Sequence, residues 1–314
     1  MEVTSNGMKS IKEASDLEGK KVLVRVDWNV PIENGEVLDD FRIEKSLPTV
    51  KYLLESGAQV FLATHLEEGE MQDLQSFVPK GAELLENLRV NSGEEANSTE
   101  FARELAGWAD IYVNEAFSTS HREHASIVGV PKLLPRFAGL QLMQEVENLS
   151  KAFNPPHPFL FILGGAKQDT KIPLIEKFLD LSDSIFVGGT LAKPVSESSI
   201  GKNPNIFFPH GDITALDIDS ETVRELSGKI KSAKFILWNG PLGNYEKGYR
   251  KGTLELAQAV AAASGESVVG GGDTLAAIKE LGILEQFSFV STGGGAMLDF
   301  LANGTLPGIK ALSR

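Results

Sequence analysis

The chain of 314 residues contains no cysteine, which excludes disulfides, thiolate catalysis and cysteine-bound zinc. It also lacks an apolar run near 18 residues, so we expect no transmembrane helix. Its first residues, MEVTSNGMKSIKEAS, lack the apolar core of a signal peptide. Basic residues are outnumbered, giving a formal net charge of −13, and they form no cluster along the sequence. We therefore expect a cytoplasmic protein that binds neither nucleic acid nor an anionic membrane.

Short β-branched runs alternate with helical patterns along the whole chain. This alternation predicts an α/β fold with two doubly wound parallel-sheet domains. Helices are expected at 43–57 and 252–264, among other places. The expected strands are 21–30, 59–66 and 110–117 in the first half, and 158–167, 183–190, 234–243, 267–274 and 287–296 in the second.

A helical pattern at 139–153 is followed by the proline-rich stretch NPPHP. We interpret this helix as a connector between domains at 1–150 and 151–314. An ordinary crossover helix within one domain is the alternative.

Glycines follow nearly every expected strand of the second half. In parallel α/β sheets, ligands bind at these strand ends, and glycine loops before helices favour phosphate groups. Neither G-x-x-x-x-G-K-[ST] nor G-x-G-x-x-G is present, which argues against a generic P-loop enzyme and against a dinucleotide dehydrogenase. The clusters are Gly164–Gly165, Gly188–Gly189, Gly240 with Gly243, Gly270–Gly272 and Gly293–Gly295.

Charged residues near these glycines allow two interpretations each. Lys167 and Lys171 stand four apart at an expected helix start, where they are either exposed or close to an anion. Asp273 follows the third glycine cluster, where it could cap a helix or hold a magnesium ion. Capping is the simpler interpretation.

The first half instead places polar side chains at or just beyond its strand ends. Converging arginines would suit a small, highly charged anion, although each arginine alone could be a solvated surface group. His121 and His124 are spaced as a metal pair could be, but are more simply polar packing residues. The candidate residues are Asp27, Asn29, Arg42, His65, Arg89 and Arg122.

Taken together, these stretches resemble the phosphoglycerate kinase family. The motifs occur in the order RVDWNVP, DDFRI, LLENLR, VNEAFSTSHREHAS, ILGGAK, WNGPLGNYE, GGGDT and STGGGA, from about residue 20 onward. The resemblance implies two α/β domains facing each other across a cleft, joined by a helix, with a tail at about 300–314 packing back on the first domain. It implies a monomer that uses magnesium and transfers a phosphoryl group between 1,3-bisphosphoglycerate and ADP.

The same resemblance implies roles for individual residues. Arg42, Lys167, Lys171, Gly271 and Gly294 would be catalytic, and Asp273 would hold the magnesium ion. The phosphoglycerate would be held by Asp27, Asn29, Arg42, His65, Arg89 and Arg122. The nucleotide would be held by Lys167, Lys171, Gly188, Gly189, Asn239, Pro241, Glu246, Gly270, Gly271, Gly272, Asp273 and Thr274.

The chain departs from the family pattern in several places. Glu68 stands where the family has an arginine, and Thr190 replaces a glycine. Segments between Leu66 and Leu84 and within 191–234 are shorter than in the family. We therefore expect weakened phosphoglycerate binding. A catalytically silent nucleotide-binding relative is the main alternative to an active kinase.

Overall fold

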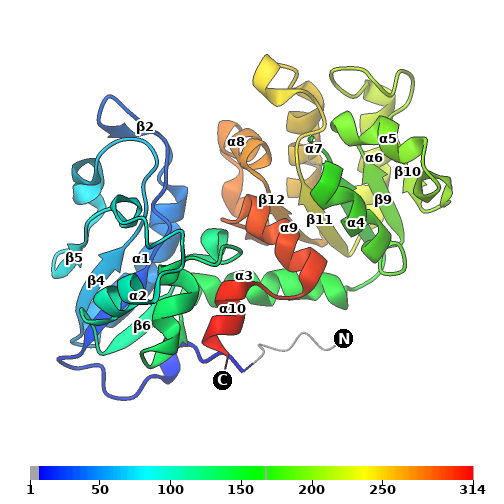
Figure 1. Ribbon diagram of the computed structural model, residues 1–314. Coiled ribbons are helices and arrows are strands. Elements are labelled where there is room, and N and C mark those ends of the chain that lie inside the picture. Colours follow the sequence, from blue (N-terminus) through cyan, green and yellow to red (C-terminus); the bar gives the residue numbers. More distant parts are fainter. Residues whose placement is uncertain (1–6, 167, 314) are drawn as a thin grey trace. The chain divides into compact units, whose positions relative to one another are not determined.

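The computed structural model describes residues 7–166 and 168–313, which divide into two compact units (Figure 1). The N-terminal unit contains residues 7–147 together with 305–313, and the C-terminal unit contains 148–304. The boundary falls inside helix α3 (Leu140–Ser150). Two units, each with its own parallel sheet, establish an α/β fold.

The sheet of the N-terminal unit has the strand order β5-β4-β1-β6-β7, and every neighbouring pair is parallel. The chain starts in the centre, adds strands on one side and then on the other, so the order reverses between β1 and β6. Such a switch point is where open α/β sheets bind ligands. The strands are β1 (Lys21–Arg25), β4 (Gln59–Ala63), β5 (Ala82–Leu84), β6 (Ile111–Asn114) and β7 (Arg136–Ala138).

Helices and a small hairpin complete the N-terminal unit. Helix α1 (Phe41–Glu55) packs on β4 and buries Ile43, Val50 and Leu53 in the core. Ser98 caps the N-terminus of helix α2 (Thr99–Ala106), and its side chain accepts hydrogen bonds from two backbone N–H groups. Strands β2 (Ile32–Glu33) and β3 (Glu36–Val37) form the antiparallel hairpin. The C-terminal helix α10 (Pro307–Leu312) packs beside β7.

The C-terminal unit repeats this plan with six parallel strands in the order β10-β9-β8-β11-β12-β13. Its switch point lies between β8 and β11, the two central strands, which are buried along their whole length. The strands are β8 (Phe159–Leu163), β9 (Ser184–Val187), β10 (Ile206–Phe207), β11 (Phe235–Asn239), β12 (Glu266–Gly270) and β13 (Phe289–Val290).

The helices of the C-terminal unit pack in two groups. Helix α4 packs on α9, whereas α6 packs on α7 and α7 on α8 (Figure 1). The helices are α4 (Gln168–Phe178), α5 (Ala192–Ser196), α6 (Ser220–Ser232), α7 (Lys251–Ala261), α8 (Gly272–Glu280) and α9 (Gly294–Asn303).

Each strand expected from the sequence is present but shorter than predicted. The run 21–30 is a strand only to Arg25, and 287–296 contains only the two-residue strand β13. The reason is common to all of them: the polar and glycine residues at the end of each run leave the sheet to form loops. No helix within the described residues is both long and apolar enough to span a membrane.

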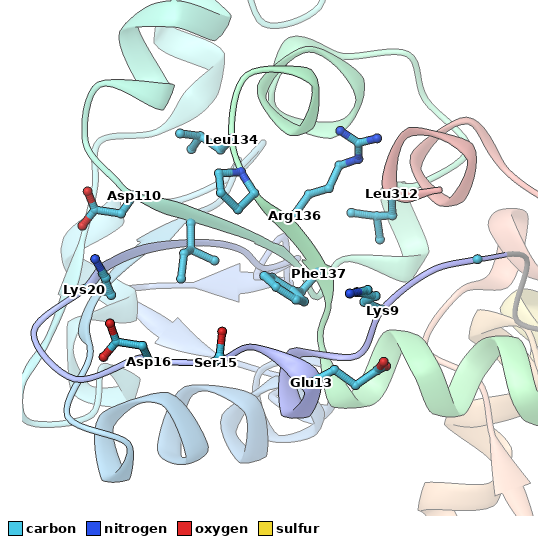
Figure 2. A pocket seen from close by; sticks show the side chains of 13 residues that line it. Lys9, Glu13, Ser15, Asp16, Lys20, Asp110, Leu134, Arg136, Phe137 and Leu312 are labelled. Carbon is cyan, nitrogen blue, oxygen red and sulfur yellow. The ribbon is translucent and has the colours of Figure 1, made fainter. Parts of the chain in front are cut away.

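A cavity of about 580 Å³ lies in the N-terminal unit, beside the residues that precede β1, β6 and β7 (Figure 2). Its charged lining is balanced between Lys9, Lys20 and Arg136 on one hand and Glu13, Asp16 and Asp110 on the other. It lies at the amino ends of the strands, opposite to the edge where parallel sheets bind ligands. The functional site is therefore expected at the carboxyl ends of the strands.

Candidate active site

In the N-terminal unit, side chains that follow β1 and β6 meet a side chain of α1 at the switch point. Asp27 follows β1, and its carboxylate accepts a hydrogen bond from the hydroxyl of Ser118, which follows β6. Arg42, in the first turn of α1, places Nη1 3.3 Å from Asp27 Oδ2 and donates to the Asn29 carbonyl at 3.0 Å. Burial alone would raise the pKa of Asp27, but the charge of Arg42 and the Ser118 bond outweigh it and lower that pKa. Asp27 is therefore a carboxylate that orients Arg42.

His65 is buried beside this pair, and its environment fixes its protonation. Burial, followed by the positive charge of Arg25, lowers the pKa of His65 to about 3. Its Nδ1 lies 3.2 Å from Nη2 of Arg25, which can only donate, so Nδ1 accepts and the proton sits on Nε2. Nε2 is itself buried and has no hydrogen-bond partner in the described part of the chain. The site thus contains an N–H donor that is available to a ligand oxygen.

This assignment predicts that His65 stays neutral, with its proton on Nε2, from pH 7.5 down to pH 5. Long-range proton–nitrogen NMR spectra of the labelled protein would check it, and His65→Gln would identify the resonance. The tautomer should be constant through that range, because the lowered pKa lies well below it. A titration of this ring with a midpoint between pH 6 and 7 would contradict the assignment.

Two further arginines lie near His65. Arg89, in the 3₁₀ helix η3 (Leu88–Val90), is largely covered, and its Nη1 donates to Glu95. Both Arg89 and Arg122 are close enough to contribute to lowering the pKa of His65. The structure therefore brings together the six candidates predicted for this half, and Glu67 donates its backbone N–H to Asn29 Oδ1 beside them.

His121 and His124 do not lie on one face of a helix. Residues 121–124 are not helical, so the i, i+3 spacing does not align the two rings. His124 instead lies 3.9 Å from the buried carboxylate of Glu94. No group of three or more metal-ligating side chains is found among the described residues.

In the C-terminal unit, the loops after β8 and β11 approach each other very closely at the switch point. The N–H of Gly164 donates to the Asn239 carbonyl at 3.0 Å, and that of Gly165 donates to the Pro241 carbonyl at 2.8 Å. Lys171 lies in α4 and is buried, so the exposed alternative is wrong for this residue. Its Nζ donates to the Gly164 carbonyl at 2.6 Å and to the Asn239 carbonyl at 3.4 Å. Lys167 lies outside the described residues.

A second cavity, of about 550 Å³, opens beside these loops. Apolar and polar groups share its lining, as is usual for small-molecule sites. Of the predicted nucleotide residues, Gly189, Pro241, Glu246 and Asp273 line it, and Thr190 lines it too. Lys193, Tyr245 and the segment 213–216 also line the cavity and were not predicted from the sequence. The segment gave no signal because it shows no periodic pattern.

The remaining predicted residues lie around the starts of α8 and α9. Gly271 precedes α8 with φ +109° and packs against Gly294, the first residue of α9. Thr274 accepts the N–H of Gly240 at 3.0 Å. Asn239 is buried with its amide 3.6 Å from Met297 Sδ and does not line the cavity. Gly188 follows β9, Gly270 ends β12 and Gly272 begins α8.

Asp273 does not cap α8, contrary to the simpler interpretation of the sequence. The cap position is occupied by Gly271, which has no side chain, and Asp273 is the second residue of the helix. Burial raises the pKa of Asp273, and the nearby charge of Glu246 raises it further, against the effect of Lys171. Two carboxylates facing one cavity form a position that a divalent cation would stabilise.

Arg25 is a residue of the site that the sequence analysis missed. It is buried in β1, donates from Nε to Ser126 Oγ at 2.8 Å and lies against His65. Burial lowers its pKa, while Glu94 and Asp27 raise it. A charged residue inside an apolar strand run was the available signal.

Two doubly wound units, one with an arginine-rich switch point and one with glycine loops around a cavity, are typical of α/β proteins that bind phosphorylated ligands. The family model "Phosphoglycerate kinase" matches residues 11–83, 70–203 and 191–304. The phosphoglycerate kinase of Desulforudis audaxviator is 37% identical over 388 residues, covering 97% of this chain and 98% of that protein.

Solved structures agree with the sequence match. The phosphoglycerate kinase of Coxiella burnetii has a TM-score of 0.84 and 32% identity, covering 97% of this chain and 98% of that one. The enzyme of Pyrococcus horikoshii has a TM-score of 0.85 and 26% identity, with the same coverage. The chain belongs to the phosphoglycerate kinase family. It is a glycolytic phosphotransferase with a carboxyl group as acceptor.

The comparisons also show that this chain is shorter than its relatives. An alignment of 388 positions exceeds the 314 residues of the chain, so part of it consists of gaps in this sequence. The three matched segments of the family model overlap at residues 70–83 and 191–203. Both places lie inside the stretches where the sequence analysis expects family segments to be missing.

Proposed function

We propose that the N-terminal unit binds 3-phosphoglycerate or 1,3-bisphosphoglycerate, and that the C-terminal unit binds ADP or ATP. The observation that carries the first assignment is the buried Nε2–H of His65, which has no partner among the described residues and has Arg42, Arg89 and Arg122 close by. Neutral donors and guanidinium groups together suit phosphate and carboxylate oxygens. Asp27 and Asn29 complete this proposed acceptor site.

For the nucleotide, the second cavity and the loops at the switch point support the assignment. Gly165, Gly189 and Pro241 line this cavity with little side-chain bulk, which lets a ligand approach the backbone. The helix starts at Gly272 and Gly294 present N–H groups that favour phosphate. Lys171 fastens the Gly164 and Asn239 loops together and adds positive charge.

The family uses magnesium with its nucleotide, and the residues of this chain fit such an ion. Asp273 and Glu246 line the same cavity, and the pKa of Asp273 is raised by burial and by the charge of Glu246. Mg²⁺ commonly uses one or two carboxylates together with substrate phosphates. We propose Asp273 as the protein ligand. The ion, when bound, offsets the negative charge of the nucleotide phosphates.

The chemistry needs little acid or base assistance from the protein. A carboxylate is a competent nucleophile toward a phosphoryl group and a good leaving group in the reverse direction. Catalysis then depends on positioning and on stabilising charge around the transferred group. We propose that Arg42 supplies positive charge on the acceptor side and Lys167 on the nucleotide side. Gly271 and Gly294 supply backbone N–H groups. We also propose a cytoplasmic, monomeric enzyme.

A coupled assay with ATP, Mg²⁺ and 3-phosphoglycerate tests this proposal, with glyceraldehyde-phosphate dehydrogenase and NADH reporting product. Arg42→Ala should lower kcat/KM about 10- to 100-fold, because it removes a charge-assisted contact. Lys167→Ala should lower kcat about 100-fold or more, the loss typical for removal of a group that stabilises transition-state charge. Arg224→Ala is the matched control, because Arg224 is exposed on α6 and pairs with Glu221 of the same helix.

The outcomes separate the two candidate functions. Turnover that falls in Arg42→Ala and Lys167→Ala, but not in Arg224→Ala, supports the proposed roles. ATP binding without any turnover by the parent protein would favour a catalytically silent relative. Full activity of Arg42→Ala would refute its assignment to the acceptor site.

A further inference from the structure

The backbone after β4 is held in place on both sides by asparagine side chains. The N–H of Glu67 donates to Asn29 Oδ1 at 3.0 Å. Asn87 bonds both polar backbone groups of Leu66, receiving its N–H at 3.1 Å and donating to its carbonyl at 2.7 Å. The same Asn87 oxygen accepts the N–H of Arg89 at 3.0 Å. Asn87 therefore fixes the backbone of Leu66, the neighbour of Glu67, relative to that of Arg89.

The guanidinium of Arg89 has two edges in different surroundings. Nη1 donates to Glu95, which holds the group in one orientation. Nε is buried and has no hydrogen-bond partner in the described part of the chain, and Nη2 lies 4.0 Å from the Glu67 carboxylate. That separation is too long for a hydrogen bond but short for two opposite charges. The Nε–Nη2 edge is thus the one available for bidentate binding of an oxyanion.

Glu67 and Glu95 consequently have different relations to Arg89. Glu95 makes a direct hydrogen bond and orients the side chain, so it resembles a supporting residue. Glu67 makes none, and more than half of its side chain is exposed. Its carboxylate nevertheless stands beside Nη2 of the Nε–Nη2 edge, where it would meet an anionic ligand bound to that edge.

We propose that Glu67 is a specificity-determining residue that weakens the binding of the anionic acceptor by competing for the Nε–Nη2 edge of Arg89. This inference rests on the proposed role of Arg89 in holding 3-phosphoglycerate. The phosphate group of the acceptor must displace the carboxylate and then bear its repulsion. Such competition acts on ground state and transition state alike, so it raises KM without changing kcat.

The test compares Glu67→Gln with Glu68→Gln in the full chain. Both variants remove one negative charge from adjacent exposed positions, but only Glu67 faces Arg89. Glu67→Gln should lower KM for 3-phosphoglycerate about three- to fivefold, the size expected for one exposed charge pair. Its kcat should be unchanged. Glu68→Gln should change KM by less than about twofold, because its charge acts only through screened solvent. Arg89→Ala should raise KM and abolish the effect of Glu67→Gln.

Each outcome bears on one hypothesis. If Arg89→Ala leaves KM unchanged, the proposed role of Arg89 in the acceptor site fails. If Arg89→Ala raises KM while Glu67→Gln leaves it unchanged or raises it, the competition proposed for Glu67 is overturned and the acceptor site stands. An equal fall of KM in Glu67→Gln and Glu68→Gln would also overturn it, because general charge would then explain the effect.

Discussion

Replacing Gly164 by alanine is expected to destabilise the C-terminal unit by about 3 kcal/mol or more, the upper range for overpacking. A Cβ at this position would stand 2.8 Å from the Gly240 carbonyl oxygen and closer still to that of Pro241. Both obstacles are backbone atoms at the end of β11, held by the Gly164–Asn239 and Gly165–Pro241 hydrogen bonds. Neither can move without parting the two central strands. ATP binding should be lost together with stability, since Gly165 and Pro241 line the second cavity.

Gly228→Ala is the matched control within the same unit. Gly228 lies inside α6, and a Cβ there would meet no atom within 4 Å. Alanine at this position should raise the free energy of unfolding by about 0.5–1 kcal/mol, because glycine is a poor helix former. Urea unfolding of the parent and both variants, with ATP affinity measured by calorimetry, checks the pair. Gly164→Ala with parental stability and ATP affinity would mean that the two loops adjust freely.

The sequence predicted the architecture because buried parallel strands read as uninterrupted apolar runs. The runs around β8 and β11 are examples, since all five residues of each strand are buried. The edge strands β5, β7 and β10 were missed. Each of them contains only two or three residues and lies at a sheet edge, so it is not marked by a long apolar run. The stretch SSIGKNPNIFFPHGD, in which the sequence predicts no element, contains β10, an edge strand paired with β9.

The candidate site could be predicted in position but not in detail. Polar residues directly after parallel strands must meet at one edge, and this placed Asp27 and His65 together. The contact between Glu67 and Arg89 depends on two loops that Asn87 brings together. Sequence order carries no such information. The sequence accordingly drew attention to Glu68, whereas in the structure its neighbour Glu67 approaches the arginine.

Glu115 should make the stability of the N-terminal unit depend on pH. This carboxyl group directly follows β6 and is almost fully buried. It accepts hydrogen bonds from the Thr49 hydroxyl and from the N–H groups of Gln141 and Leu142 at the start of α3. Burial raises the pKa of Glu115 from 4.5 to about 8, and the charge of Glu145 contributes in the same direction. The hydrogen bonds oppose this shift but are outweighed by it.

The sign of the effect follows from proton linkage. The folded protein binds this proton more tightly than the unfolded chain does, so the contribution of Glu115 to stability is greatest below pH 4.5 and falls as the pH rises to about 8. The loss over the whole interval is on the order of 4 kcal/mol. Glu115→Gln removes this titratable group and should make the stability of the unit depend less on pH. At pH 5.5 it should be about 1–2 kcal/mol less stable than the parent, because the amide cannot accept every bond that the carboxyl accepts.

At pH 8.5 that difference should shrink or reverse, because only the parent must then bury a charge. Urea unfolding at pH 5.5, 7 and 8.5 measures both curves, and Glu86→Gln at an exposed position serves as the control. Parallel curves for the parent and Glu115→Gln would show that the group titrates alike in both states. Convergence would mean that the start of α3, which leads into the C-terminal unit, is held by a carboxyl group that is neutral at acidic pH and becomes costly to bury as the pH rises.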